Sequence, residues 1–323
     1  MKITDVTVTL FKWENIPLKS YDAAVKMVTT DSDLGLVRIK TDEGLEGHGL
    51  LGLSLHPASL DAPHIVRFLK PILMGQNPLY RERLYQNLSR MRAQVSTQAV
   101  CAVDAALWDL AGKISGLPIH ALIGTFRDKI PVYASSEQHE TVEGYVEQAL
   151  AVKEAGYHGY KLHPNQRWRE DISACKAVRK AVGDDFTLML DSRSGYDLGQ
   201  AVMVGRAIEE LGFLWYEEPL PYTDIYNYSK LLKKLEIPVM ATEFPAGWLD
   251  QYAPWIMNKA TDMLRGDVML KGGITTLLKI AHLAEAFSMK IEIHHGSNSI
   301  NDVANLHVQM AIPNTSFMEV LLP

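Results

Sequence analysis

A regular alternation of short apolar runs and longer amphipathic stretches fills the sequence after residue 128. Eight runs rich in β-branched or apolar residues begin 23 to 30 residues apart: IPVYASS, GYHGYKLH, FTLMLD, FLWYEE, IPVMATE, GDVML, MKIEIHH and FMEVLL. Because a helical pattern follows each run but the last, the rhythm predicts parallel β–α units, and eight such units close into a barrel. An open doubly wound sheet is the alternative, but its G-x-G-x-x-G signature follows none of the early runs.

The first part of the chain has a different pattern. The stretches ITDVTVTLF and GLVRIKTDEGLEGHGLLG alternate as antiparallel strands do, with a turn at Asp42-Glu43-Gly44. From about Pro63 to Gly124 the apolar residues take a helical spacing, which breaks at Gly116-Leu117-Pro118. We therefore expect an α+β domain at residues 1–125 and a barrel domain at residues 126–323.

Composition excludes several classes of protein. The chain has 323 residues, 47% of them hydrophobic, and its formal charge of -6 disfavours nucleic acid or an anionic membrane as a partner. No run approaches the roughly 18 apolar residues of a membrane span, and MKITDVTVTLFKW lacks the apolar core of a signal peptide. With only two cysteines, Cys101 and Cys175, a reducing compartment is expected. The sequence thus predicts a cytoplasmic protein.

Acidic residues end three consecutive runs of the predicted barrel. Asp191, Glu217 and Glu243 follow one another at intervals of 26 residues, and barrel chemistry gathers at the carboxyl ends of the strands. Neighbouring parallel strands lie about 4.8 Å apart, so three carboxylates at one level repel one another unless a cation lies between them. Hard oxygen ligands suit Mg²⁺ better than Zn²⁺. Alternatively, each acid caps a helix or pairs with a surface lysine.

Most of the remaining runs also end in ionisable groups. Lys161 and His163 are two residues apart, so on a strand they share one face. Asp267, the pair His294-His295 and Glu319 belong to the last three runs. An isolated histidine at such a position is usually structural, but a carboxylate beside it would fix its tautomer and raise its basicity.

Several motifs make the whole chain resemble the enolase superfamily, and within it the mandelate racemase-like subgroup. They are VCAVDAALWDLAGKISGLPIHALIG, LMLDSRSGYD, WYEEPLP, MATEF, GDVMLKGGIT and EIHHGSN. The resemblance implies a modified TIM barrel, (β/α)7β, covered by an N-terminal α+β capping domain. It also implies that Asp191, Glu217 and Glu243 hold Mg²⁺, which binds a substrate carboxylate and stabilises the enediolate formed when a base removes the α-proton.

The resemblance also implies roles for the other strand-end groups. One base is a histidine paired with Asp267, and the HGSN context favours His295 over His294, since alternation lets only one of the two face inward. Glu319 matches an electrophilic glutamate that acts as a protonated acid, although a salt bridge at the barrel mouth is the alternative. Arg193, two residues after Asp191, is a candidate contact to a substrate hydroxyl or carboxylate.

Residues 161–163 depart from the subgroup, in which Lys-x-Lys is usual. Lys161 can still place a positive charge near the substrate carboxylate, and His163 remains a candidate base or acid on the face opposite His295. Lys271 is the minority candidate for the base, because the muconate-lactonising branch uses a lysine on the sixth strand.

Specificity is expected to come from the cap, where Lys19, Tyr21 and His56 offer polar contacts to a hydroxylated acid, unless they lie in a solvated loop. Members of the family usually return to the cap after the eighth strand, whereas this sequence ends at Pro323. We therefore expect either a C-terminally incomplete sequence or a cap that closes differently.

Taken together, these features predict a Mg²⁺-dependent enzyme that removes the proton α to a carboxylate. Dehydration of a sugar acid, a hydro-lyase reaction on a small-molecule carboxylate, is the favoured outcome. Racemisation or epimerisation by His163 and His295 and cycloisomerisation are alternatives, as is an inactive barrel that acts as a binding protein. The resemblance further implies a homo-oligomer.

Overall fold

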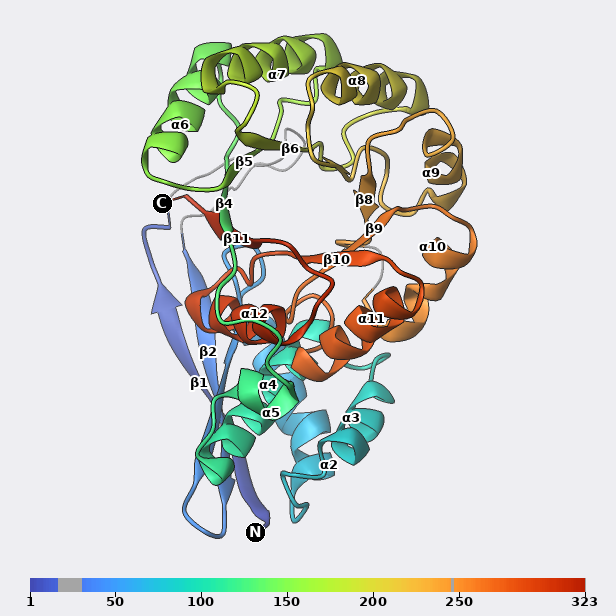
Figure 1. Cartoon of the computed structure of the whole chain (residues 1–323). Coiled ribbons are helices and arrows are strands. Elements are labelled where there is room, and N and C mark those ends of the chain that lie inside the picture. The colour runs from blue at the N-terminus through green and yellow to red at the C-terminus, as the bar shows by residue number, and fades with distance from the viewer. Residues whose placement is uncertain (17–30, 245–246, 323) are drawn as a thin grey trace.

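The computed structural model describes residues 1–16, 31–244 and 247–322, which form a closed barrel of parallel strands and an N-terminal cap (Figure 1). The strands close in the order β10-β11-β4-β5-β6-β7-β8-β9, and a helix follows each of them except β11. The (β/α)7β barrel with an α+β cap that the sequence predicted is thus confirmed.

The cap contains an antiparallel sheet and a set of helices. Its elements are β1 (Ile3–Trp13), β2 (Ser32–Thr41), β3 (Glu46–Leu51), α1 (Ala58–His64), the π-helix η1 (Ile65–Leu69), α2 (Lys70–Leu73), α3 (Arg81–Ser89), α4 (Thr97–Ser115) and α5 (Ile119–Ile123). Two glycines on β3 let α4 pack closely on the sheet. A Cβ atom at Gly47 or Gly49 would lie 2.1 or 2.0 Å from the carbonyl oxygens of Ala106 and Ala102.

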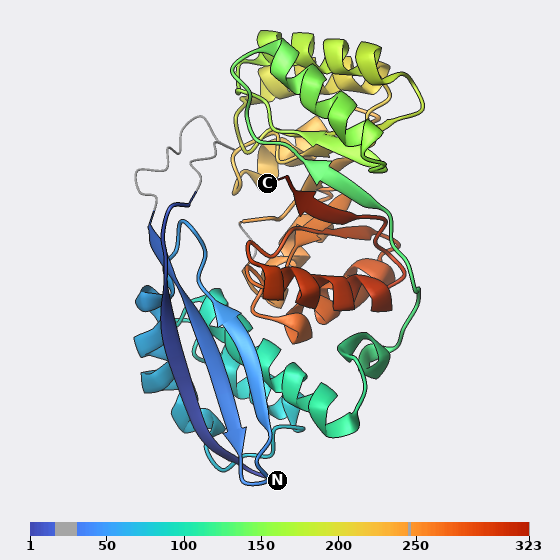
Figure 2. The same cartoon turned by 90° about the vertical axis from the view of Figure 1, so that its left-hand side faces the viewer.

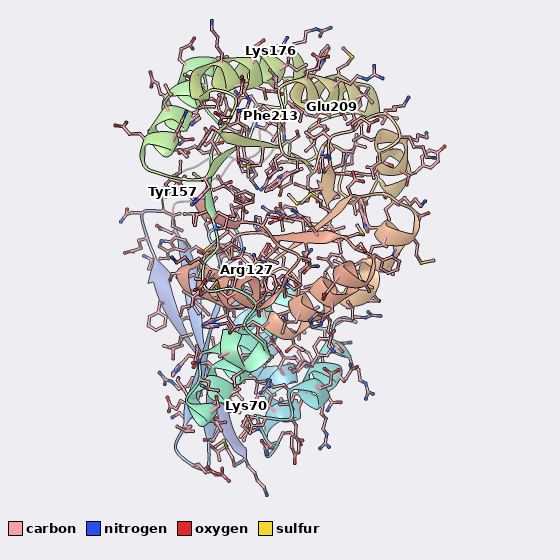
Figure 3. The ribbon with its side chains drawn as sticks, viewed as in Figure 1. Lys70, Arg127, Tyr157, Lys176, Glu209 and Phe213 are labelled. Atoms are coloured by element: carbon pink, nitrogen blue, oxygen red, sulfur yellow. The ribbon has the colours of Figure 1, made fainter. Side chains whose placement is uncertain are left out.

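The barrel begins after α5. Its elements are β4 (Val132–Ser135), α6 (Val142–Glu154), β5 (Gly159–Leu162), α7 (Trp168–Val182), β6 (Thr187–Asp191), α8 (Leu198–Glu210), β7 (Tyr216–Glu217), α9 (Ile225–Leu231), β8 (Val239–Ala241), the 3-10 helix η2 (Leu249–Gln251), α10 (Ala253–Met257), β9 (Met263–Gly266), α11 (Ile274–Ala286), β10 (Lys290–Ile293), α12 (Ser299–Ala311) and β11 (Met318–Leu321). Side chains fill its interior rather than leaving a pore (Figure 3).

Cap and barrel meet on the side where the barrel strands end. β11, the last barrel strand, runs toward the side of the barrel on which the cap sheet lies (Figure 2). Asn298, after β10, donates from Nδ2 to the carbonyl oxygen of Gly52 at 3.3 Å, and Arg92 pairs with Asp250 at 2.9 Å. These two contacts join the cap to loops that follow barrel strands, while the cap helices lie beside the barrel, next to α11 and α12 (Figure 1).

One strand lies earlier in the sequence than expected. The run GDVML was interpreted as a strand, but β9 ends at Gly266 and the following residues turn. Asp267 causes this turn, since its Oδ1 accepts from the backbone N–H groups of Met269 and Leu270 at 2.7 and 2.8 Å. No helix in the described part of the chain is long and apolar enough to cross a membrane.

Candidate active site and metal centre

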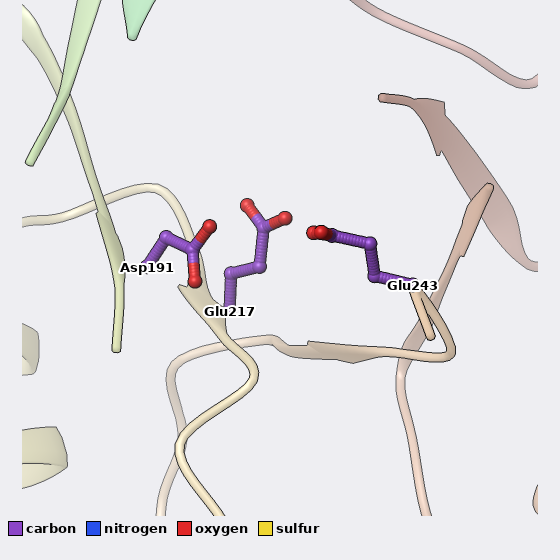
Figure 4. A group of neighbouring side chains, drawn as sticks. All are labelled: Asp191, Glu217 and Glu243. Carbon is purple, nitrogen blue, oxygen red and sulfur yellow. The ribbon is translucent and has the colours of Figure 1, made fainter. Parts of the chain in front are cut away.

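Three carboxylates converge inside the mouth of the barrel. Asp191 ends β6, Glu217 ends β7, and Glu243 lies two residues beyond the end of β8. Each offers an oxygen within 4.8 Å of the other two, all three are buried, and their side chains point toward one another (Figure 4). The sequence prediction that these acids meet is confirmed by this geometry.

This cluster can hold a metal ion. Its donors are all carboxylate oxygens, the ligands that Mg²⁺ prefers. Glu243 Oε1 is buried and makes no hydrogen bond to any residue that the structure describes; its nearest basic groups are His294 Nε2 at 3.5 Å and Arg193 Nη1 at 3.9 Å. Burial, reinforced by Asp191 and opposed by Arg265, raises the pKa of Glu217 to about 8. A cation at the centre of the triad would offset both features.

Two fully buried cations lie against the triad. Lys161, on β5, has its Nζ 3.4 Å from Asp191, 3.0 Å from Glu217 and 2.7 Å from Glu319. Arg265, on β9, pairs through Nε with Glu217 at 2.7 Å and through Nη2 with Glu319. Burial and Arg265 oppose the charge on Lys161, but Glu217 and Glu319 outweigh them and raise its pKa well above the ordinary value. Lys161 therefore lies among three carboxylates that favour its charged form.

Glu319 pairs with both buried cations. Burial favours a protonated acid, but Arg265 and Lys161 outweigh it and hold the pKa of Glu319 well below the ordinary value. These ion pairs favour a charged Glu319, and its role as a protonated acid stays a prediction. The alternative, a salt bridge at the barrel mouth, is what the structure shows.

His163 contacts one acid of the triad directly. Its Nε2 lies 3.0 Å from Asp191 Oδ2 and its Nδ1 lies 2.6 Å from the carbonyl oxygen of Ser136. Both partners are hydrogen-bond acceptors, a carboxylate oxygen and a backbone carbonyl oxygen. The ring is thus oriented by β4 and tied to one of the three acids.

The Asp–His pair forms with a different histidine than expected. His294 Nδ1 lies 2.9 Å from Asp267 Oδ2, whereas the ring of His295 accepts from the backbone N–H of Ser297. The preference for His295 as the partner of Asp267 is therefore wrong. The alternation rule does not apply because β10 ends at Ile293, and both rings lie together with their centroids 3.9 Å apart.

His294 has the setting of an acid–base group. Its Nε2 points toward Glu243 of the triad while Asp267 holds the other ring nitrogen. Burial lowers its pKa, but Glu243 and Asp267 outweigh burial and leave it above the ordinary value. Burial and the charge of His294 hold the pKa of His295 well below the ordinary value.

The other site residues that the sequence predicted lie in the cap, near the triad or outside the described residues. Lys19 and Tyr21 lie outside the described residues. His56 pairs within the cap, with its Nε2 2.8 Å from Asp61 Oδ2 on α1. Arg193 lies over the ring of Phe244, with its guanidinium carbon 5.3 Å from the ring centroid. Lys271 is fully buried, burial lowers its pKa to about 8, and its amine donates to the backbone carbonyl groups of Thr242 and Glu243.

Sequence reasoning missed two buried residues of this site, Arg265 and Glu218. Arg265 interrupts the apolar β9 with a guanidinium, and such a residue in a barrel interior signals a buried ion pair. Glu218 directly follows Glu217 in WYEEPL, and its Oε1 accepts from the backbone N–H of Glu243 at 2.8 Å.

The barrel, the cap and the acidic triad at the strand ends define a class, the enolase superfamily of enzymes. Residues 3–124 match the family of mandelate racemase / muconate lactonizing enzyme N-terminal domains, and residues 144–323 match the enolase C-terminal domain-like family. The chain therefore belongs to the mandelate racemase / muconate lactonizing enzyme family.

Similar proteins within that family are known by activity. The chain is 31% identical to arabinonate dehydratase of Saccharolobus solfataricus, covering 88% of this chain and 78% of that protein. It is 30% identical to D-galactarolactone cycloisomerase of Agrobacterium fabrum, covering 86% and 75%. The crystal structure of D-glucarate dehydratase from Agrobacterium tumefaciens complexed with magnesium superimposes with a TM-score of 0.90 at 36% identity, covering 100% of this chain and 87% of that one.

Proposed function

We propose that this protein is a Mg²⁺-dependent dehydratase of a sugar acid, which converts a 2,3-dihydroxy carboxylate into a 2-keto acid. The observation that carries the proposal is the buried triad Asp191, Glu217 and Glu243 with the His294–Asp267 pair directed toward it. The dehydratases among its relatives support the choice of reaction.

In this proposal Asp191, Glu217 and Glu243 would hold Mg²⁺ through their carboxylates. When bound, the ion supplies electrostatic stabilisation for the negative charge that develops on the substrate carboxylate as its α-proton leaves. Lys161, which carries a charge at the same level of the barrel, attracts the substrate carboxylate. Arg265 and Glu319 pair beneath them and fix the Glu217 carboxylate.

His294 moves the proton. Asp267 accepts a hydrogen bond from Nδ1–H, so in the neutral imidazole Nε2 carries the lone pair and faces the triad. His294 Nε2 takes the proton from C2, and the imidazolium returns that proton to the hydroxyl leaving C3. Water departs, and the resulting enol tautomerises to the 2-keto acid, so one acid–base group serves both steps.

The contacts of His163 support dehydration rather than racemisation as the proposed reaction. A racemase needs a second base with a lone pair facing the substrate, but both ring nitrogens of His163 face acceptors. We assign His163 the task of orienting Asp191. Arg193 and His56 are proposed to lie near the substrate's hydroxylated end.

The test is a screen of sugar acids, including arabinonate, galactarate and glucarate, for 2-keto acid formation with Mg²⁺. At least one acid should react, with turnover lost on removal of Mg²⁺ and in Glu217→Gln. Exchange of the C2 proton without loss of water would favour a racemase instead. A chain that turns over no acid, with Mg²⁺ and Glu217→Gln both without effect, would be a binding protein.

A further inference from the structure

Glu243 differs from the other two acids of the triad in how its backbone is held. Asp191 and Glu217 are the last residues of β6 and β7 and pair with each other across the ladder, so the sheet fixes their positions. β8 ends at Ala241, and its pairing with β9 ends at Ala241 and Leu264. Glu243 therefore lies beyond the ladder, where other contacts must set its position.

Two buried side chains supply these contacts. Lys271, after β9, donates from Nζ to the carbonyl oxygen of Thr242 at 2.9 Å and to that of Glu243. Glu218, after β7, accepts the backbone N–H of Glu243 on Oε1 at 2.8 Å. The N–H and the C=O of Glu243 are thus both bound by side chains from neighbouring strand ends, and none of these residues is more than 1% exposed.

The backbone at this point needs such support. Thr242 has φ +89°, a region that β-branched residues rarely adopt and that costs on the order of 1–3 kcal/mol. Its side chain is also held, because Thr242 Oγ1 donates to the carbonyl oxygen of Arg265 and accepts its N–H, at 3.0 and 2.9 Å. Without the Lys271 bonds, this peptide could relax and carry the Glu243 carboxylate away from the triad.

We propose that Lys271 and Glu218 are positioning residues for the metal centre, which clamp the backbone of Glu243 so that its carboxylate meets Asp191 and Glu217. The inference rests on the proposed Mg²⁺ site. It gives Lys271 a task other than removing a substrate proton. Residues that orient metal ligands typically contribute roughly 10- to 100-fold to metal affinity.

Isothermal titration of the purified full chain with Mg²⁺ alone tests this proposal. Lys271→Met keeps the length of the side chain but loses its donors, and Glu218→Met loses its acceptor. Each should weaken Mg²⁺ binding roughly 10- to 100-fold. Glu218→Gln keeps an acceptor oxygen and should bind within about threefold of the wild type, which separates the hydrogen bond from the charge.

Ile280→Val is the matched control for a loss of stability alone. Ile280 is fully buried on α11, so the change lowers the melting temperature and should leave Mg²⁺ affinity unchanged. Wild-type affinity in both Lys271→Met and Glu218→Met would overturn the clamp while leaving the metal site intact. If Lys271→Met does not fold, the Glu218 pair decides, and equal affinity in Glu218→Met and Glu218→Gln overturns the clamp. A wild-type chain that binds no Mg²⁺ would overturn the metal site and the clamp together.

Discussion

Two adjacent histidines on one loop have different partners, and on this difference we assign proton transfer to His294. Asp267 binds His294, whereas the ring of His295 accepts a backbone N–H. His294→Asn should lower turnover by about 10²–10⁴-fold, the usual contribution of a general acid–base group. His295→Asn should retain most of the turnover. The measurement is 2-keto acid formation from the acid found in the screen, and a larger loss in His295→Asn than in His294→Asn would contradict the assignment.

Arg265 is the residue on which the buried charges most depend. It pairs with Glu217 and Glu319 in the barrel interior without exposure to solvent. Arg265→Met should lower the free energy of unfolding by about 3–5 kcal/mol, because it leaves two carboxylates with less compensation in a buried site. Urea denaturation measures this change.

A second substitution, Glu319→Met, separates the loss of charge pairing in Arg265→Met from the loss of packing. In Arg265→Met with Glu319→Met, one of the uncompensated carboxylates is gone, so the double variant should be more stable than Arg265→Met alone. A double variant whose stability loss equals the sum of both single losses would show that lost packing, not lost pairing, is responsible.

The sequence predicted the positions of those site residues that end a strand. Asp191 and Glu217 end strands, so their convergence follows from the barrel rule. The choice between His294 and His295 failed because both residues lie beyond β10, where alternation no longer determines direction. Lys271 was considered as a base, and its actual contacts depend on the positive φ of Thr242, which no sequence pattern indicates.

At the scale of elements, the periodicity of the sequence predicted which strands form. It predicted the residues at which they begin and end less accurately. The eight strands of the barrel and the sheet of the cap follow from spacing alone. The sixth barrel strand was placed after Arg265 instead of around it, because the apolar letters of GDVML were taken as a strand. In the structure Asp267 binds the backbone of the following turn, and glycines at 272 and 273 with φ +76° and +103° lead into α11.

A buried carboxyl group joins a cap helix to a barrel helix. Asp104 on α4 accepts from the backbone N–H and the Oγ1 of Thr275, at the start of α11, at 2.9 and 2.6 Å. Burial raises the pKa of Asp104 to about 6 from its ordinary 3.8. A carboxyl group whose pKa is higher in the folded state favours folding when protonated, so its contribution is lost as pH rises from about 4 to 6.

The expected size of this loss is about 3 kcal/mol, since each pKa unit corresponds to about 1.4 kcal/mol. Asp104→Asn cannot ionise, so the difference in unfolding free energy between wild type and variant should shift in favour of the variant as pH rises from 4 to 7. Urea denaturation across this range measures it. A difference that stays constant with pH would show that Asp104 does not titrate in this way.

At the scale of the whole molecule, the metal site couples to folding. Three carboxylates meet inside the barrel mouth, and a cation that binds them only in the folded chain should stabilise that chain. Mg²⁺ at 100 times its dissociation constant should add about 2.7 kcal/mol to the free energy of unfolding. Thermal denaturation with Mg²⁺ or with EDTA measures this, and Glu217→Gln should remove most of the difference. Equal melting temperatures in Mg²⁺ and EDTA would contradict a metal site.

The most direct test of the central claim follows the substrate's C2 proton. The chain is incubated in D₂O with Mg²⁺ and the sugar acid that gives most product in the screen, and both the product and the recovered acid are examined by NMR. We expect a 2-keto acid with deuterium at C3, formed only with Mg²⁺ and lost in His294→Asn. Deuterium at C2 of recovered acid without any 2-keto acid, or product formation that persists in EDTA, would contradict it.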